Sequence, residues 1–128
     1  MATDDFGSLL RRLREAAGLS CNELARLVAV DPSYISRLER GEREPPRRLV
    51  VERLADALGL SPIERDRLLV SAGYSPGAIR ALGGWDPTLH AVAELLADPQ
   101  LPAREREAFR TVIDLLAERW RRLTPRAS

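Results

Sequence analysis

Helix start and stop signals recur at short intervals and constrain the fold of this chain more than any other feature. Capping boxes stand at 20–23 and 61–64, where a serine precedes a glutamate by three positions. Asp-Pro pairs at 31–32 and 86–87 also favour helix starts, because aspartate caps orphan N–H groups and proline fits the first helical position. Glycines that tolerate a left-handed conformation follow most apolar runs, at Gly18, Gly41, Gly59 and Gly73. Strand signals are nearly absent, so we predict an all-α fold.

Apolar residues between these signals recur at helical spacing and predict how the chain is organised. We expect five helices in a compact domain over residues 1–74, with Leu24, Leu27 and Val28 as the apolar set of the second helix. A Pro- and Gly-rich linker over 75–87 is expected to hold one short helix. A helical hairpin is expected over 88–128, with its last helix running from about Ala103 to Leu123.

Composition excludes several classes of protein. The 20 basic and 19 acidic side chains give a net charge of +1, so bulk charge does not indicate nucleic acid. One cysteine excludes an intramolecular disulfide and a multi-cysteine metal site, and His90 has no ligand partner at metal spacing. We find no Ser/His/Asp set and no phosphate loop, so we expect no catalysis, no cofactor and no metal. The chain lacks a signal peptide or an apolar run of about 20 residues, which predicts a cytoplasmic protein without membrane contact.

The second and third predicted helices have the properties of a DNA-binding helix-turn-helix. A small residue, Ala25, can face the third helix, and the turn over 28–31 is short. Ile35 and Leu38 stand three apart and can point inward. The outer face of the third helix is then polar, with Ser33, Tyr34, Ser36 and Arg37.

The residues Leu19-Ser20-Cys21-Asn22-Glu23-Leu24-Ala25 and Tyr34-Ile35-Ser36-Arg37-Leu38-Glu39-Arg40-Gly41 together resemble the Xre/Cro-like, phage-repressor-type family of helix-turn-helix regulators. Pro46, Leu49 and the run 54–60 continue the likeness, which covers roughly residues 6 to 73. The resemblance implies a five-helix lambda-repressor-like domain that binds double-stranded DNA at a specific sequence and regulates transcription.

The resemblance also implies roles for individual residues. The third helix would lie in the major groove, with base contacts from Pro32, Ser33, Tyr34 and Arg37. The second helix would aim its N-terminal N–H groups at a phosphate. Contacts to the DNA backbone are expected from Ser20, Cys21, Asn22, Ser36, Arg40, Arg43 and Arg47. Arg14 and Glu39 stand where the family forms a structural ion pair.

The sequence departs from the family pattern in three respects. Cys21 replaces the usual glutamine that contacts phosphate; a redox switch is one reading, and we favour a plain small residue. Ala29 stands where the turn often has glycine, since the position wants a positive φ, at a cost of about 1 kcal/mol. Glu42 and Glu44 replace basic residues, which predicts modest affinity for phosphate.

The last predicted helix carries apolar residues spaced 4, 3, 4 and 3 apart, which is the pattern of a coiled-coil seam. Its members are Phe109, Ile113, Leu116, Trp120 and Leu123. The helix packs either on its own domain or on another chain. We favour a homodimeric repressor on a palindromic operator, because one helix-turn-helix reads only a few base pairs. The alternative is an antitoxin or adaptor whose C-terminal helices hold a partner protein; a ligand-sensing regulator would need a cavity.

Overall fold

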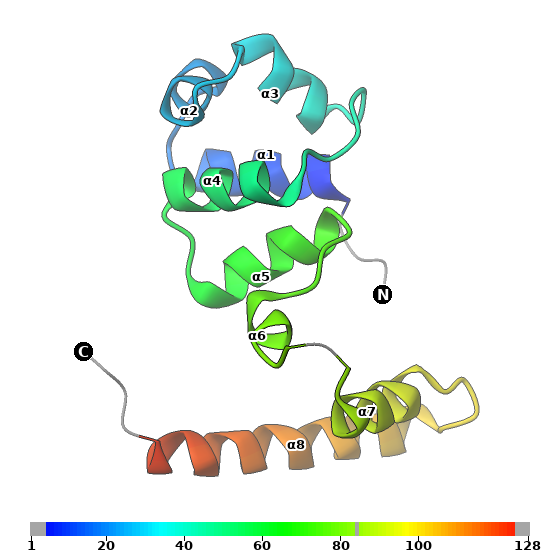
Figure 1. Ribbon diagram of the computed structural model, residues 1–128. Coiled ribbons are helices and arrows are strands. Elements are labelled where there is room, and N and C mark those ends of the chain that lie inside the picture. Colours follow the sequence, from blue (N-terminus) through cyan, green and yellow to red (C-terminus); the bar gives the residue numbers. More distant parts are fainter. Residues whose placement is uncertain (1–4, 84, 125–128) are drawn as a thin grey trace. The chain divides into compact units, whose positions relative to one another are not determined.

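The computed structural model describes residues 5–83 and 85–124, and all regular structure in these ranges is helical. The chain divides into two compact units, residues 1–84 and 85–128. The first unit holds α1 (Phe6–Ala16), α2 (Cys21–Val28), α3 (Pro32–Glu39), α4 (Arg48–Leu58), α5 (Pro62–Ser71) and the short α6 (Gly77–Arg80) (Figure 1). The second holds α7 (Pro87–Ala97) and α8 (Ala103–Leu123). The prediction of an all-α fold is confirmed.

Side-chain caps form at the helix starts that the sequence predicts. The Ser20 hydroxyl accepts from the Glu23 N–H at 3.0 Å, and the Glu23 carboxylate accepts from the Ser20 N–H at 3.0 Å. A second capping box joins Ser61 and Glu64. Each cap satisfies N–H groups that have no partner within the first turn of a helix.

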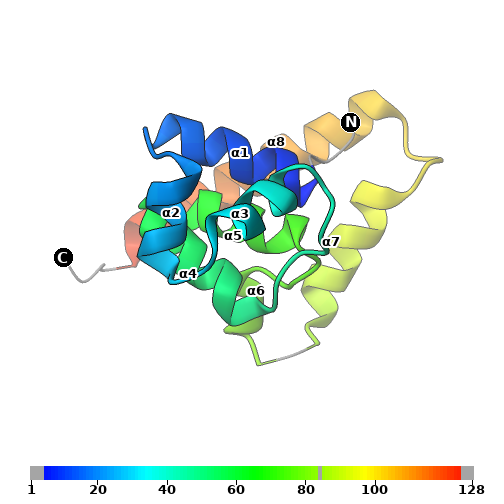
Figure 2. The ribbon, with the colours of Figure 1, turned by 90° about the horizontal axis from the view of Figure 1, so that it is seen from above.

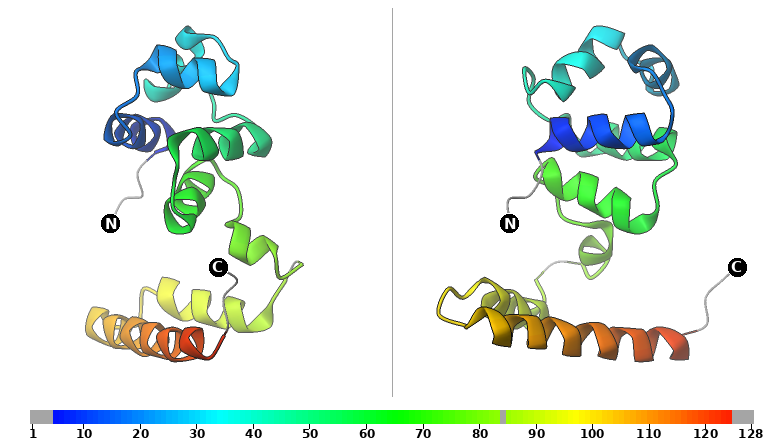
Figure 3. Two further views of the ribbon diagram at one scale, coloured as in Figure 1. Left: turned by 90° about the vertical axis from the view of Figure 1, so that its left-hand side faces the viewer. Right: turned by 180° about the vertical axis from the view of Figure 1, so that it is seen from behind.

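The first unit is built in layers. Helices α2 and α3 lie together on one side of α1 and α4, and α5 lies on the opposite side (Figure 1, and the right view of Figure 3). Seen from above, α2 and α3 form the face nearest the viewer (Figure 2). Apolar side chains from α1 to α5 meet between these layers, and the most enclosed are Leu10, Leu24, Ile35, Leu38, Val51, Leu54, Leu68 and Leu69.

Ala25 is buried as expected, whereas Leu27 is 61% exposed. The inward face of α2 is taken by Leu24, Ala25 and Val28. At 100° per residue, Leu27 stands about 100° from the centre of that face. Leu27 belongs to the apolar set that predicted this helix, but it lies outside the core because an eight-residue helix offers only one narrow buried stripe.

Tyr74 and the start of the segment that we predicted as a linker, 75–87, are tied into the first unit. The Tyr74 hydroxyl donates to the Pro46 carbonyl at 2.8 Å, and Arg48 Nη1 donates to the Ser75 carbonyl at 2.9 Å. The Gly77 N–H donates to Asp66 Oδ1 at 2.8 Å at the start of α6. These bonds extend the first unit beyond residue 74.

The second unit is a helical hairpin, and α7 and α8 diverge from the loop that joins them (Figure 2). Arg106 holds this loop, since its Nη2 donates to the carbonyls of Asp98 at 2.6 Å and Leu101 at 2.9 Å. Over the range 85–124, no side chain of this unit is buried. None of the helices described is long and apolar enough to cross a membrane.

Gly7 sets the distance between α1 and α3. It is buried, and a Cβ built on it would lie 2.4 Å from the Leu38 carbonyl oxygen and 2.8 Å from that of Glu39. Both atoms belong to backbone near the end of α3 and cannot rotate away. Only glycine lets α1 approach the end of α3 this closely.

We expect Gly7→Ala to destabilise the first unit by about 1–3 kcal/mol, because a methyl group here forces the two helices apart. Elsewhere in a helix this substitution stabilises by about 1 kcal/mol, so the sign of the change in the free energy of unfolding alone tests the close approach. Urea unfolding followed by circular dichroism measures the change. Gly77→Ala is the matched control, since its Cβ would meet only Asp66 Oδ1 at 3.4 Å, and it should cost little. A Gly7→Ala variant as stable as the wild type would contradict the close approach.

Candidate nucleic-acid interface

Helices α2 and α3 are joined by the short turn over 29–31. Ala29 caps α2 in the left-handed conformation, with φ 59° and ψ 46°. The next N–H, of Val30, donates to the Ala25 carbonyl at 3.0 Å, which closes the turn. The turn geometry that this family usually assigns to glycine is thus kept here with alanine.

An ion pair fixes the far end of α3 to α1. Arg14 donates from Nε to Glu39 Oε2 at 2.6 Å and from Nη2 to Oε1 at 3.0 Å. The two side chains are only 14% and 7% exposed. Hydrogen bonding to Glu39 outweighs the desolvation of Arg14 and raises the pKa of its guanidinium. Nη1 also donates to the Leu19 carbonyl at 2.9 Å, so one side chain joins α1, the loop before α2, and α3.

The Cys21 thiol lies 4.0 Å from Glu39 Oε2, so its side chain is directed at this ion pair. A contact from Cys21 to a phosphate would therefore come from its backbone N–H. Within the described residues, the capping box occupies the N–H groups of Ser20 and Glu23 and leaves those of Cys21 and Asn22 at the N-terminus of α2. Helix α2 thus keeps two main-chain donors at its positive end.

Helix α3 exposes most of the residues that we predicted as base contacts. Pro32, Ser33 and Arg37 are exposed, whereas Tyr34 is half-buried, as is Ser36, which we predicted as a contact to the DNA backbone. Asp31 caps the helix and accepts from the Ser33 N–H at 2.8 Å and from the Ser33 hydroxyl at 2.7 Å. These two bonds, with a smaller effect of Arg37, hold the pKa of Asp31 below its ordinary value.

Basic side chains flank this face. Arg43 lies over the Tyr34 ring, 5.6 Å from its centroid, a cation–π contact that positions the guanidinium beside α3. Arg40 Nη2 lies 3.2 Å from Glu42 Oε2, and Arg47 is exposed at the start of α4. Because Glu42 offsets Arg40, less positive charge faces outward here than the arginines alone indicate.

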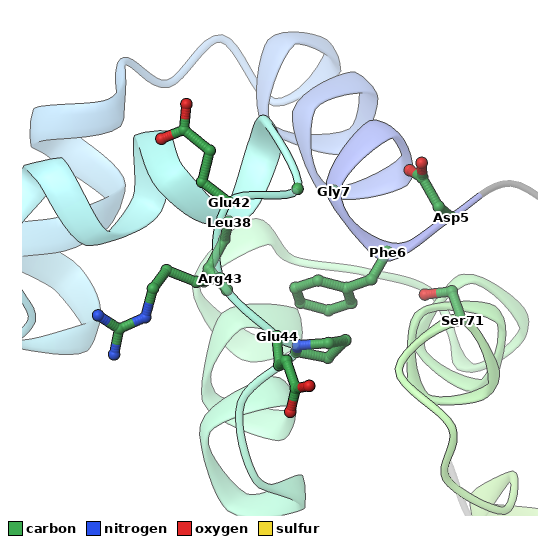
Figure 4. A pocket seen from close by; sticks show the side chains of 10 residues that line it. Asp5, Phe6, Gly7, Leu38, Glu42, Arg43, Glu44 and Ser71 are labelled. Carbon is green, nitrogen blue, oxygen red and sulfur yellow. The ribbon is translucent and has the colours of Figure 1, made fainter.

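A hollow of about 390 Å³ lies where the start of α1 meets the loop after α3. The Phe6 ring points into it between Leu38 and Glu44, and Ser71 of α5 lies at its edge (Figure 4). Phe6 is only 4% exposed, so it fills the floor of the hollow. The hollow adjoins the loop that carries Arg43 and is open to solvent. Across the described parts of the chain, no three His, Cys, Asp or Glu side chains gather as a metal site.

The sequence predicted Ser33, Tyr34 and Arg43 as DNA contacts but did not predict two side-chain contacts that position them. The clamp of Asp31 on the Ser33 hydroxyl could have been found from the Asp-x-Ser spacing, since aspartate commonly bonds two residues ahead in a turn. The stacking of Arg43 on Tyr34 joins residues nine apart across a loop, and no local pattern indicates it.

Comparison with known proteins settles the family. The family described as helix-turn-helix domain matches residues 5–68, which is half of the chain and contains α1 to α4 and most of α5. The chain belongs to the helix-turn-helix domain family. This confirms the resemblance drawn from residues 19–41.

Relatives of this helix-turn-helix chain carry regulator names. It is 32% identical over 114 residues to the "Uncharacterized HTH-type transcriptional regulator Rv0023" of Mycobacterium tuberculosis, an alignment that covers 89% of this chain and 39% of that protein. It is 39% identical over 71 residues to the "HTH-type transcriptional repressor RghR" of Bacillus subtilis, covering 56% of this chain and 50% of the repressor. The chain thus spans half or less of the length of these relatives.

A solved structure titled "SINR PROTEIN/SINI PROTEIN COMPLEX" aligns with 93% of this chain and 99% of its own chain. Its sequence identity is 21% and its TM-score is 0.46.

We expect Ala29→Gly to stabilise the first unit by up to about 1 kcal/mol, because glycine adopts the left-handed conformation without the strain that a Cβ causes. The gain exceeds the added chain entropy of glycine in the unfolded state, which opposes it. Thermal and urea unfolding measure the difference. The matched control is Ala16→Gly, the same change at an exposed position in α1, which should lower stability. Equal losses of stability in the two variants would show that the left-handed backbone at Ala29 carries no strain.

Proposed function

We propose that this chain is a sequence-specific DNA-binding transcription regulator that acts as a repressor on a palindromic operator. The observation that carries the proposal is the outward polar face of α3, with Ser33 and Arg37 exposed and the helix held to α1 by the Arg14–Glu39 pair. The regulator and repressor names of its relatives support the same assignment.

In this proposal α3 enters the major groove with its N-terminal half against base edges. Arg37 donates two parallel hydrogen bonds to guanine, and Ser33, Tyr34 and Pro32 contact neighbouring bases. Phosphates on either side are held by the N-terminus of α2, by one residue of α3 and by the flanking arginines. The residues that contact the DNA backbone are Ser20, Cys21, Asn22, Ser36, Arg40, Arg43 and Arg47. In this proposal the chain is not an enzyme, and it acts on double-stranded DNA in the cytoplasm.

The second unit supplies the dimer in this proposal. Across residues 85–124 it has no buried side chain, and several large apolar residues are each more than half exposed, among them Trp85, Leu115, Trp120 and Leu123. A unit of about 40 residues rarely stabilises itself without oligomerisation, and a bare apolar surface of this kind marks an interaction site.

A second copy of the chain fits this surface by charge. Residues 85–102 carry Asp86, Glu94 and Asp98 and no arginine. The last turns of α8 carry Arg119, Arg121 and Arg122 against one acidic residue, Glu118, which pairs with the last two and leaves this end basic. In a two-fold dimer each copy offers both the acidic and the basic segment, which makes the surface self-complementary. A mostly apolar hollow of about 290 Å³ offers the partner's seam a surface to pack against; it is lined by Leu95, Leu101, Glu105, Ala108, Phe109 and Val112.

The predicted seam of α8 differs along its length. Phe109 and Ile113 are half-buried, whereas Leu116 is 39% exposed, Trp120 57% and Leu123 70%. The exposed end is the part that we assign to the partner copy. Two recognition helices would then read half-sites about 34 Å apart, one turn of DNA.

Selection of bound DNA from a random library tests the first part of the proposal. The wild-type chain should enrich one short motif in two inverted copies. Arg37→Ala should lose discrimination at one guanine by about tenfold or more while the rest of the motif stays. Arg40→Ala is the matched control: it removes a phosphate contact and should weaken binding evenly across sequences. A wild-type chain without sequence preference would overturn the assignment.

Light scattering on the purified intact chain tests the dimer. We expect a dimer for the wild type and a monomer for Trp120→Glu, because a charge in the seam cannot be buried unpaired. Thr111→Glu places the same charge on an exposed position of α8 outside the seam and should leave the dimer intact. Circular dichroism confirms that the variants remain helical. A monomeric wild type, alone and on DNA, would contradict the dimer and favour a different partner protein for α7 and α8.

A further inference from the structure

The hydrogen bond between Ser33 and Asp31 has a direction, and that direction bears on which bases α3 can read. Ser33 Oγ lies 2.7 Å from Asp31 Oδ1, and the Ser33 N–H donates to the same oxygen at 2.8 Å. The two bonds fix both the backbone and the side chain of Ser33 relative to the cap. The hydroxyl is therefore held in one orientation at the first turn of α3.

The Ser33 hydroxyl must be the donor in this bond. An ionised carboxylate has lone pairs and no hydrogen, so it can only accept. The two bonds from Ser33 hold the pKa of Asp31 below its ordinary value, so the carboxylate is ionised at neutral pH. The one hydroxyl hydrogen is committed to Asp31, and only lone pairs of Ser33 Oγ remain for another group.

We propose that Ser33 reads the operator as a hydrogen-bond acceptor, and so selects a base that presents an amino group in the major groove, adenine through N6 or cytosine through N4. This inference rests on the proposed function, since it requires α3 in the major groove. Guanine and thymine present acceptors at the corresponding edge, namely O6 with N7 and O4. An acceptor facing an acceptor leaves both groups desolvated and unpaired.

Arg37 stands one helical turn after Ser33, on the same side of α3, and has the opposite polarity. Its guanidinium carries only donors, so it selects guanine. The recognition helix therefore presents an acceptor at its start and donors one turn later. The predicted half-site has adenine or cytosine at the base facing Ser33 and guanine at the base facing Arg37, with discrimination of about tenfold at each.

Asp31 acts here as a positioning residue, because it sets the orientation of the Ser33 hydroxyl. Removing Asp31 frees the hydroxyl to rotate and donate, and Ser33 then tolerates guanine and thymine as well. Asp31→Gly suits this test, since it removes the carboxylate while glycine is tolerated at the N-cap, so the loss of stability is only a few tenths of a kcal/mol. Asp5 offers a matched control, because its side chain also caps a helix, accepting from the Ser8 N–H at 2.7 Å at the start of α1 rather than at the start of α3.

Library selection with the intact wild type, Ser33→Ala, Asp31→Gly and Asp5→Gly tests the inference. We expect adenine or cytosine at one position of the wild-type motif. Ser33→Ala should lose about tenfold of this preference and keep the Arg37-dependent guanine, and Asp31→Gly should admit guanine and thymine there. Asp5→Gly should leave the motif unchanged.

The inference is overturned by guanine or thymine at the Ser33-dependent position of the wild type, by an Asp31→Gly motif identical to the wild type, or by an Asp5→Gly motif changed as much as that of Asp31→Gly. A preference that survives Ser33→Ala also overturns it, because Asp31 itself would then be the reader. In each of these cases the chain still selects DNA, so the proposed function stands. If the wild type enriches no sequence, the proposed function is wrong, and the inference about Ser33 fails with it.

Discussion

The Arg14–Glu39 ion pair is the interaction on which the proposed DNA-binding face depends. It is bidentate and almost wholly enclosed, and it ties the end of α3 to α1 and to the loop before α2. A buried charge needs its partner, since leaving one alone costs several kcal/mol. Gly7 lets the same two helices approach, and the Cys21 thiol closes over the pair. The outward residues of α3 are thus presented on a rigid support.

That support compensates for the absence of a strong positive field. The net charge of the chain is +1, and Glu42 offsets Arg40 beside the motif. Non-specific attraction to DNA grows with the number of cations that meet phosphates, so it is small for such a surface. Under the proposed function, recognition would then come from fixed groups: the clamped Ser33, the exposed Arg37 and the Arg43 that stacks on Tyr34. Few contacts to DNA phosphates, combined with well-oriented base contacts, would favour sequence specificity over total affinity.

The sequence predicted the helix order because caps and stop residues act locally, as Ser20, Asp31 and Ser61 show. It failed where tertiary packing decides. Leu27 repeats at a helical interval and yet lies outside, because the short α2 buries a single stripe. The tie from Tyr74 to Pro46 and the close approach at Gly7 join distant segments, which periodicity cannot reveal. The apolar stripe of α8 can be read from the sequence, but what packs against it cannot, since such a stripe does not specify its partner.

Chemical protection of operator DNA by the intact chain tests the central claim most directly. Dimethyl sulfate methylates guanine N7 in the major groove and adenine N3 in the minor groove. We predict that the bound chain protects guanine N7 in two patches one helical turn apart, about 34 Å, and that Arg37→Ala removes the protection at one guanine of each patch. Protection confined to adenine N3, or a guanine pattern unchanged in Arg37→Ala, would contradict the placement of α3 in the major groove.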